Sequence, residues 1–211
     1  MTIPIETDIV FGIPLGVTQI PIEICTKLKS LPALQGQNHD VKFEDNPELY
    51  NVLGYNAKLK KAITEIFSAW INNLSGNDEQ KWVMTTNWIT ENTNGAAMTE
   101  HAHTNCMYSA VIYFDDILPE HPPLILMNPL APSLNTNLYV RQVNANPFNA
   151  TNYVCPCKTG IMIMFPSMVK HGHAAYKSKV SRKSFACNFF PVGRFSSKDS
   201  SLDTNWLSYD D

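Results

Sequence analysis

The sequence lacks the features of membrane insertion and of secretion. No apolar run approaches the ~20 residues that a helix needs to cross a bilayer. The opening segment, MTIPIETDIVFGIPLG, has neither the basic start nor the long apolar stretch of a signal peptide. We therefore expect a soluble protein of the cytoplasm that has no membrane partner.

Strong charge and a disulfide framework are absent as well. The net charge is −3 and no block of like charge stands out, so we do not expect nucleic acid as the main partner. Cys155 and Cys157 have one residue between them and no second pair, so a structural zinc site is not expected there. An odd number of scattered cysteines is typical of reduced thiols, and the five are Cys25, Cys106, Cys155, Cys157 and Cys187.

Helical periodicity is confined to the first third of the chain, which has no internal repeat and no low-complexity linker. Pro21 can begin a short helix that Pro32 ends. A longer helix is predicted for about residues 57–74, with Asn56 as its N-cap and Gly76 just past its end. Its apolar stripe is expected to pack on a sheet and consists of Leu59, Ile63, Ile66, Phe67, Trp70, Ile71 and Leu74.

Short strands dominate the chain from about residue 82. Segments rich in β-branched or aromatic residues are predicted strands, and irregular loops connect them; these segments are residues 84–90, 108–114, 160–165 and 184–190. The arrangement favours an antiparallel sandwich or barrel over about residues 80–195, with the helices of the first third against one side.

Four of the six histidines form two pairs, a His-Ala-His run at 101–103 and a His-Gly-His run at 171–173. On a strand, residues i and i+2 project from one face, so His101 and His103 can point at the same spot. His171 lies just past the end of an apolar strand, a position that often presents ligands. It would complete a facial metal site with open positions for substrate and oxygen. Imidazole binds Fe, Zn, Ni and Cu, so these donors alone do not select the metal.

The predicted strand near the C-terminal end has two different faces. Arg182, Ser184 and Asn188 share one face, and apolar residues occupy the other. Arginine offers a planar fork that binds a carboxylate through two hydrogen bonds, and Ser184 adds a hydroxyl donor. Close to a metal site, this face is suited to a small carboxylate ligand.

Taken together, these motifs resemble the Fe(II)/2-oxoglutarate-dependent oxygenase superfamily, and within it a small branch found in phages and marine bacteria. That branch has a Trp-containing strand, a glycine, a His-X-His pair and a Ser-containing strand that ends in Tyr. Its later motifs, Phe-Pro-Ser-x-x-x-His and Arg-x-Ser, resemble residues 165–171 and 182–184, and its Phe-Asn pair has Cys187 in place of Phe. The other corresponding residues are Trp88, Gly95, His101, His103, Ser109, Tyr113 and Asn188, and the start resembles residues 11–14.

The resemblance implies a mainly β fold, a double-stranded β-helix or jelly roll. A single domain would cover residues 1–211, with a helical support region at 1–80, the jelly-roll core at 81–195 and a C-terminal tail at 196–211. A phage-encoded member would act in the cytoplasm of the host.

The resemblance also implies a chemistry. Fe(II) would be bound by His101, His103 and His171, with 2-oxoglutarate as cosubstrate and O2 as oxidant. The far carboxylate of the cosubstrate would reach the catalytic Arg182 and Ser184. Tyr113 and Asn188 would be further contacts, although Tyr113 also suits the role of a core aromatic residue. Oxidative decarboxylation of 2-oxoglutarate to succinate and CO2 would be coupled to hydroxylation of a substrate C–H bond.

One departure from the superfamily concerns the second metal ligand. Most members have His-X-Asp/Glu, whereas His103 here stands where the carboxylate would be. Three neutral imidazoles would leave the iron with one more positive charge, which should strengthen its hold on an anionic cosubstrate. Two other interpretations stay open: His103 and Asn105 form the operative pair, or His101 is not a ligand and a water fills the third position. His173 stands where the family pattern is usually apolar, so we expect it only to line the pocket.

Three functions compete at this point. The first is a hydroxylase that acts on a prolyl or other peptidyl residue, or on a free metabolite. The second is a cupin-type metalloenzyme that uses the same histidines without a 2-oxoacid, which leaves Arg182 and Ser184 unexplained. The third is a binding domain without activity. We expect the substrate to contact the stretch at 90–99 and the loop at 128–151, whose length is typical of a substrate-covering loop.

Overall fold

The computed structural model describes residues 12–35, 46–54, 56–77, 79–131, 146, 149–196 and 198–207. Strands outnumber helices among these residues. In chain order the elements are β1 (Gly16–Gln19), α1 (Ile22–Lys29), β2 (Leu34–Gln35), η2 (Pro47–Tyr50), α2 (Ala57–Ser75), β3 (Lys81–Asn92), β4 (Met98–His101), β5 (Tyr108–Tyr113), β6 (Ile125–Met127), β7 (Asn152–Val154), β8 (Ile161–Pro166), β9 (His171–His173), β10 (Arg182–Val192), β11 (Arg194–Phe195), β12 (Leu202–Asp203) and η3 (Asn205–Leu207).

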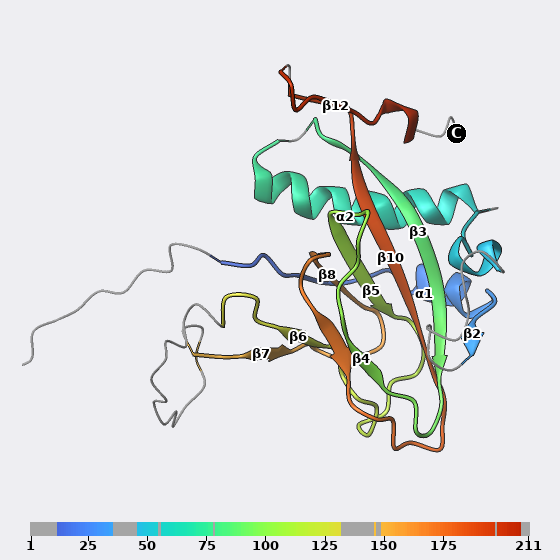
Figure 1. The fold of residues 1–211 in the computed structure, drawn as a ribbon. Coiled ribbons are helices and arrows are strands. Elements are labelled where there is room, and N and C mark those ends of the chain that lie inside the picture. The colour runs from blue at the N-terminus through green and yellow to red at the C-terminus, as the bar shows by residue number, and fades with distance from the viewer. Residues whose placement is uncertain are drawn as a thin grey trace, which may run out of the picture.

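Two antiparallel sheets form the body of the fold (Figure 1). The larger has six strands in the order β1-β8-β5-β10-β3-β2, in which only β2 and β3 are parallel. The smaller has four strands in the order β4-β9-β6-β7. In both sheets, most neighbouring strands are far apart in the sequence. This is the jelly-roll arrangement expected from the sequence.

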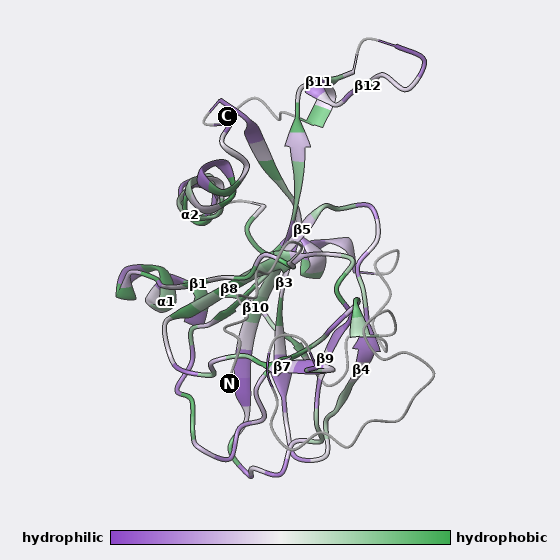
Figure 2. Ribbon diagram, turned by 90° about the vertical axis from the view of Figure 1, so that its left-hand side faces the viewer, coloured by the Kyte–Doolittle hydropathy of each residue, from purple (hydrophilic) through white to green (hydrophobic). Residues whose placement is uncertain are grey.

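The helices and the small sheet lie on opposite sides of the large sheet (Figure 2). On the helix side, Leu28 of α1 and Phe67 of α2 join one hydrophobic cluster with Phe185 and Phe189 of β10. The rings of Phe67 and Phe189 stack with centroids 3.9 Å apart. A second, smaller cluster, which includes Phe165 of β8 and Leu126 of β6, lies between the two sheets. The large sheet therefore buries both of its faces.

Both predicted helices are confirmed. Asn56 caps α2 by accepting a hydrogen bond from the Leu59 N–H at 3.1 Å, and Gly76 ends the helix with φ +66°. The stripe on α2 packs on the sheet as expected, except at its last member: Leu74 is 52% exposed, because the helix extends past the sheet there. Within the described residues, no helix is long and apolar enough to span a membrane.

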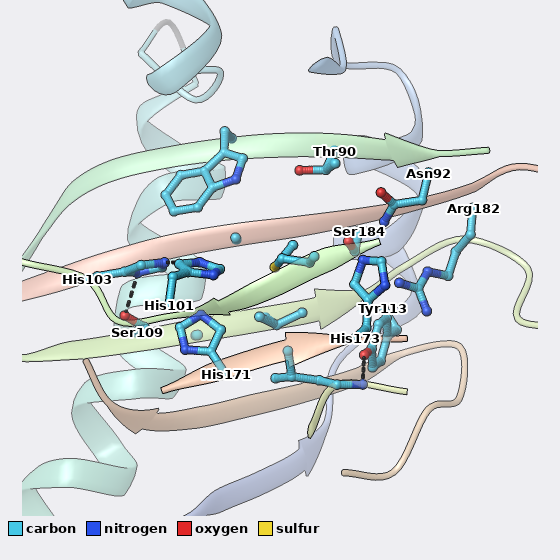
Figure 3. A pocket seen from close by; sticks show the side chains of 16 residues that line it. Thr90, Asn92, His101, His103, Ser109, Tyr113, His171, His173, Arg182 and Ser184 are labelled. Carbon is cyan, nitrogen blue, oxygen red and sulfur yellow. Dashed lines mark hydrogen bonds between the residues drawn. The ribbon is translucent and has the colours of Figure 1, made fainter. Parts of the chain in front are cut away.

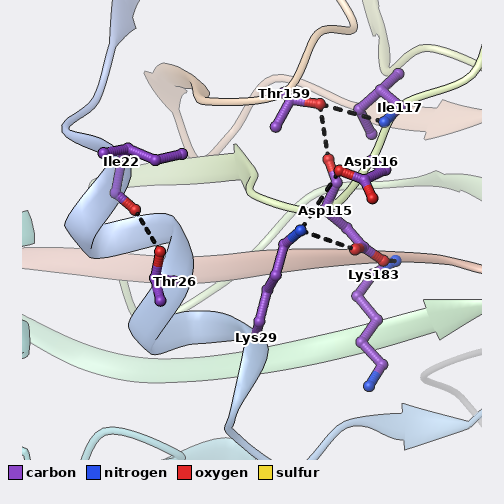
Figure 4. Close-up of polar contacts among 8 residues, drawn as sticks. All are labelled: Ile22, Thr26, Lys29, Asp115, Asp116, Ile117, Thr159 and Lys183. Atoms are coloured by element: carbon purple, nitrogen blue, oxygen red, sulfur yellow. Dashed lines mark hydrogen bonds and ion pairs between the residues drawn. The ribbon is translucent and has the colours of Figure 1, made fainter.

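The start of β10 is held by the loop that follows β5 (Figure 4). The Asp115 carboxylate accepts a hydrogen bond from the Lys183 backbone N–H at 3.2 Å. From the opposite side, Lys29 of α1 approaches Asp115 at 3.8 Å and Asp116 at 3.4 Å. Such half-exposed ion pairs add little stability by themselves. These contacts fix the position of the Lys183 backbone, and Arg182 is the residue next to it.

Replacing Asn56 with Ala should destabilise the protein by about 1 kcal/mol, because the Leu59 N–H loses its acceptor at the helix N-terminus. The measurement is the free energy of unfolding from chemical denaturation. Asn73→Ala is the matched control, since Asn73 is exposed on the same helix and alanine favours helix there. Equal stabilities for the Asn56→Ala and Asn73→Ala variants would contradict the capping role.

Candidate metal centre

Three histidine side chains converge between the two sheets (Figure 3). His101 ends β4, His171 begins β9, and the two are register partners in the small sheet. The ring centroids of His101 and His171 are 4.5 Å apart, and that of His103 lies 5.2 Å from His101 and 4.9 Å from His171. One nitrogen from each ring lies within 4.8 Å of the others. Among the described residues, these three form the one group of His, Cys, Asp or Glu that could share a metal ion.

The sequence prediction placed His101 and His103 side by side for a reason that is wrong. We expected both on one face of a strand, but β4 ends at His101. His103 lies beyond the strand, where its backbone N–H donates to the Ser167 carbonyl at 3.0 Å. The two rings meet because this turn folds the chain back toward β9.

Hydrogen bonds at the outer nitrogens fix the tautomer of each ring. Nδ1 of His101 lies 2.9 Å from the Thr99 carbonyl, and Nδ1 of His171 lies 2.9 Å from the Val169 carbonyl. A carbonyl only accepts, so each Nδ1 carries the proton and each Nε2 keeps a lone pair. Nδ1 of His103 has the same relation to the Asn188 amide oxygen at 2.7 Å.

The inner nitrogens therefore suit a cation. Nε2 of His101 and Nε2 of His103 face each other at 3.3 Å, with no proton left to lie between them in the neutral rings. Burial lowers the pKa of His171 to about 3, and burial also lowers the pKa of His103. Neutral imidazoles whose lone pairs converge are the donor set that a divalent transition metal takes. The residues present fit a metal ion such as Fe(II).

Gly172 allows the two histidine-bearing strands to approach each other. A Cβ built at Gly172 would lie 2.5 Å from the Met98 backbone oxygen of β4, closer than real Cβ contacts. A glycine inside a strand often marks such a close backbone approach. The short distance between His101 and His171 therefore requires a glycine at residue 172.

Gly172→Ala should push β4 away from β9 and weaken metal binding, at a cost of about 1–3 kcal/mol for the overpacked contact. The measurement is the affinity for Co(II), followed by its absorption spectrum. Gly12→Ala is the control, because nothing lies within 4 Å of a Cβ added there. A Co(II) affinity unchanged by Gly172→Ala would show that the strand spacing does not set the site.

A pocket extends from the histidines along β10 and β3 to Arg182 (Figure 3). Cross-strand pairing builds its floor, because Arg182 is opposite Asn92 and Ser184 is opposite Thr90. As the sequence predicts, the polar side chains of β10 face this pocket while Phe185 faces the helices. Tyr113, His173 and Trp88 also line it.

Arg182 is 2% exposed and held in one orientation. One guanidinium nitrogen, Nη1, donates to the Pro122 carbonyl at 2.6 Å and approaches the Cys157 sulfur at 3.6 Å. The guanidinium carbon lies 5.0 Å from the ring centroid of Tyr113 and 5.9 Å from that of Tyr176, distances typical of cation–π contacts. The free thiol of Cys157 thus packs against an arginine.

Buried polar atoms without a partner mark the Arg182 end of the pocket. Native interiors leave few such atoms, so a cluster of them indicates a ligand. Among the described residues that line the pocket they are Arg182 Nε, Asn92 Nδ2 and His173 Nε2. Asn92 was missed by the sequence analysis, because only the register of β3 on β10 reveals that it faces Arg182.

Two sequence hypotheses change in the light of this geometry. Asn188 does not lie with Arg182, because it is six residues further along β10 and bonds to His103; it is therefore not placed to hold the far carboxylate. Asn105 is exposed and does not line the pocket, which disfavours a His103/Asn105 pair. Tyr113 is fully buried, and its hydroxyl accepts a hydrogen bond from the Leu124 N–H at 2.9 Å.

The stretches expected to contact the substrate fare differently. Thr90, Asn92 and Met98 of the stretch at 90–99 line the pocket, but Thr90 and Asn92 do so at its Arg182 end. Of the loop at 128–151, residues 132–145 and 147–148 lie outside the described residues.

Fold and site together define a jelly roll with a candidate metal centre and a pocket that ends at a buried arginine. The family model described as "Putative 2OG-Fe(II) oxygenase" matches residues 86–188, the span that contains both histidine pairs, Arg182 and Asn188. Residues 86–188 thus match a family of 2-oxoglutarate-dependent, non-haem iron oxygenases. The match indicates an enzyme whose cofactors are Fe(II) and 2-oxoglutarate, with O2 as oxidant.

Solved structures with a similar fold include a prolyl-4-hydroxylase from Pseudomonas putida. That chain is 14% identical with a TM-score of 0.51, and the match covers 84% of this chain and 88% of that one. HygX from Streptomyces hygroscopicus, solved with nickel and 2-oxoglutarate bound, is 14% identical with a TM-score of 0.49, over 84% of this chain and 81% of that one. At such identities the likeness concerns the fold. A comparison with curated protein sequences gave no match.

Proposed function

We propose that the protein hydroxylates a substrate C–H bond with His101, His103 and His171 as the Fe(II) ligands and with Arg182 as the anchor of 2-oxoglutarate. The observation that carries this proposal is one continuous pocket with two specialised ends. Converging imidazole lone pairs occupy one end, and buried donors without partners occupy the other. In a metalloenzyme without a 2-oxoacid, the buried donors at the second end would have no ligand to bind.

Arg182 would bind the far carboxylate of the cosubstrate through donors that the protein does not use. Its Nε–H has no partner, and Asn92 Nδ2 across the strand pair is also unpartnered. Stacking against Tyr113 and anchoring on Pro122 fix the plane of the guanidinium before the ligand arrives. Preorganised, desolvated donors of this kind are stronger than the same groups in water.

Tyr113 would add one more donor to this end. Its oxygen already accepts from Leu124, so its proton can be donated, to the Cys157 sulfur in the free protein and to a ligand when one is bound. Burial raises the pKa of Tyr113 well above its ordinary value, so the phenol keeps that proton at neutral pH. Ser184, opposite Thr90 in the same floor, supplies a hydroxyl nearer the histidines.

Fe(II), when bound, supplies the redox chemistry that couples cosubstrate oxidation to substrate hydroxylation. The chain's own contribution is to orient both molecules and to exclude water. The histidines face a partly open side of the pocket, since His101 and His103 are more exposed than His171. The substrate would reach the metal from that side.

Trp88 makes a prolyl residue the first substrate to test. Its ring lies 5.6 Å from that of His103 and 6.1 Å from that of Tyr50, so an aromatic surface adjoins the metal ligands. A flat aromatic face suits the apolar ring of proline. We therefore propose a prolyl or other peptidyl residue as the substrate, and similarity to the fold of a prolyl-4-hydroxylase agrees with this choice.

Arg182→Ala should weaken 2-oxoglutarate binding by about 10- to 150-fold, because a charge-assisted hydrogen bond contributes about 1.5–3 kcal/mol. The measurement is the visible charge-transfer band that forms when 2-oxoglutarate is titrated anaerobically into protein loaded with Fe(II). Iron binding itself should persist. Arg194→Ala is the control, because Arg194 is exposed on β11 away from the pocket. Loss of iron binding in Arg182→Ala would contradict the division between the two ends.

Peptides that contain proline should stimulate the release of succinate from 2-oxoglutarate and gain one oxygen atom, detected by mass spectrometry. Trp88→Ala should lower this stimulation while leaving anaerobic 2-oxoglutarate binding in place, because Trp88 adjoins the histidines and not Arg182. Stimulation by free amino acids or other metabolites, with none by peptides, would redirect the substrate proposal.

A further inference from the structure

A buried polar network crosses four adjacent strands of the large sheet beside His103. Asn188 Nδ2 donates to Thr86 Oγ1 at 2.8 Å, and Ser109 Oγ donates to Asn188 Oδ1 at 2.8 Å. Ser109 Oγ also lies 2.8 Å from Ser167 Oγ. These residues belong to β3, β10, β5 and the turn after β8, which are neighbours in that order. The sheet therefore aligns four polar side chains in a row, and the two middle members, Asn188 and Ser109, contact one histidine.

An irregular register places Asn188 in this row. Cys187 pairs with Asn87 and Phe189 pairs with Met84, so β3 has one residue more than β10 between these pairs. Thr85 and Thr86 consequently both lie opposite Asn188, and Thr85 Oγ1 donates to the Asn188 backbone oxygen at 3.4 Å. On the other side, Asn188 is the direct register partner of Ser109. A bulge next to a site commonly aims a side chain at that site.

Each hydrogen bond of the network can be assigned one donor and one acceptor without conflict. The Asn188 amide gives its N–H to Thr86, so its oxygen is the atom that faces His103 and Ser109. Because Ser109 gives its proton to Asn188, Ser167 must be the donor of the Ser109–Ser167 bond. An amide oxygen only accepts, so in the 2.7 Å contact between Asn188 Oδ1 and His103 Nδ1 the proton belongs to the nitrogen.

The acceptor for His103 Nδ1 is a distant side chain, whereas the other two histidines use a backbone carbonyl close to them in the sequence. His101 and His171 each bond to the backbone carbonyl two residues before them, at Thr99 and Val169. His103 lies in the turn after β4, and the acceptors at its Nδ1 are the side chains of Asn188 and Ser109. The ring of His103 is thus oriented at Nδ1 by side chains from other strands.

We propose that Asn188 is a positioning residue that makes His103 a metal ligand: its amide oxygen, held by Thr86 and Ser109, keeps the His103 proton on Nδ1 and turns Nε2 toward the other two histidines. This role rests on the proposed ligand set. The sequence predicted that Asn188 contacts the cosubstrate near Arg182. The proposal instead assigns Asn188 to the metal end of the pocket. The ligand that it serves is the residue at which this chain departs from the usual carboxylate.

The test is binding of Co(II) alone to the full-length, metal-free protein, followed by the visible absorption of the ion. Asn188→Ala should weaken Co(II) binding by about 10- to 100-fold, the usual effect of removing the hydrogen-bond partner of a metal-bound histidine. Asn188→Asp keeps an oxygen acceptor of the same shape for His103 and should recover most of the affinity.

Asn92→Ala is the matched control. Asn92 and Asn188 are both buried, with 3% and 8% exposed, and both lie on the pocket side of the large sheet. Asn92 is opposite Arg182 and far from His103, so its loss should spare Co(II) binding and weaken 2-oxoglutarate binding instead. A general loss of stability would affect both variants alike, whereas a positioning role separates them.

Nitrogen-15 NMR of the histidine rings gives a readout that a merely structural role would leave unchanged. In the metal-free wild-type protein His103 should be the Nδ1-protonated tautomer, and Asn188→Ala should shift it toward the other tautomer. If Asn188→Ala does not fold, Thr86→Val provides the milder variant, because it removes the acceptor that orients the amide at similar volume. Its Co(II) affinity should fall in the same direction.

Wild-type Co(II) affinity in Asn188→Ala, or in Thr86→Val should the first not fold, would overturn the inference. His103→Ala and His171→Ala separate this failure from failure of the proposed function. If they lose Co(II) while Asn188→Ala keeps it, the ligand set stands and the positioning role falls. If they too bind Co(II) as the wild type does, the ligand set itself is wrong, and the role of Asn188 falls with it.

Discussion

The two-faced character of β10 is the constraint on which the rest of the structure depends. The strand is central in the large sheet, between β5 and β3, and the helices cover one face of this sheet while the small sheet lies on the other (Figure 2). Phe185 and Phe189 fill the core under the helices, while Arg182 and Asn188 serve the two ends of the pocket. A register slip of one residue would exchange the faces, placing a guanidinium in the core and phenyl rings at the site. The apolar contacts of α2 thus also fix the site.

The pocket opposes the stability that this packing provides. A buried polar atom without a partner costs about 1–3 kcal/mol, and the Arg182 end has several of them. The stacked rings of Phe67 and Phe189 and the cluster around them supply stability on the other face of the same strand. Donors that stay unpaired in the free protein are ready for a carboxylate and need no rearrangement to bind it. The unpaired donors that lower the stability of the free protein are therefore the same donors that would bind the ligand.

Local patterns in the sequence predicted what local physics determines. The 3.6-residue and 2-residue periodicities located the helices, the main strands and the pocket face of β10, and residue chemistry picked out His171 and Arg182. What failed depends on long-range register. His103 leaves its strand, Asn188 meets that histidine through a bulge in β3, and Asn92 faces Arg182 across a strand pair. No spacing along the chain encodes these three contacts, because each joins segments at least 80 residues apart or lies in an irregular turn.

The neutrality of the metal end explains why an amide rather than a carboxylate at residue 188 is physically sensible. His101 and His171 bond to peptide carbonyls, and His103 bonds to the Asn188 amide, so none of these partners carries a charge. A divalent cation held by three neutral imidazoles keeps its full charge for other ligands. Arg182 adds a positive charge at the far end of the same pocket. 2-Oxoglutarate, with a carboxylate at each of its ends, has the charge and the polarity that this pair of cationic positions requires. In the proposed ligand set, His103 in place of the usual carboxylate would leave the charge of the metal to be balanced by the cosubstrate instead of the protein, and a neutral partner such as Asn188 would add no negative charge of its own.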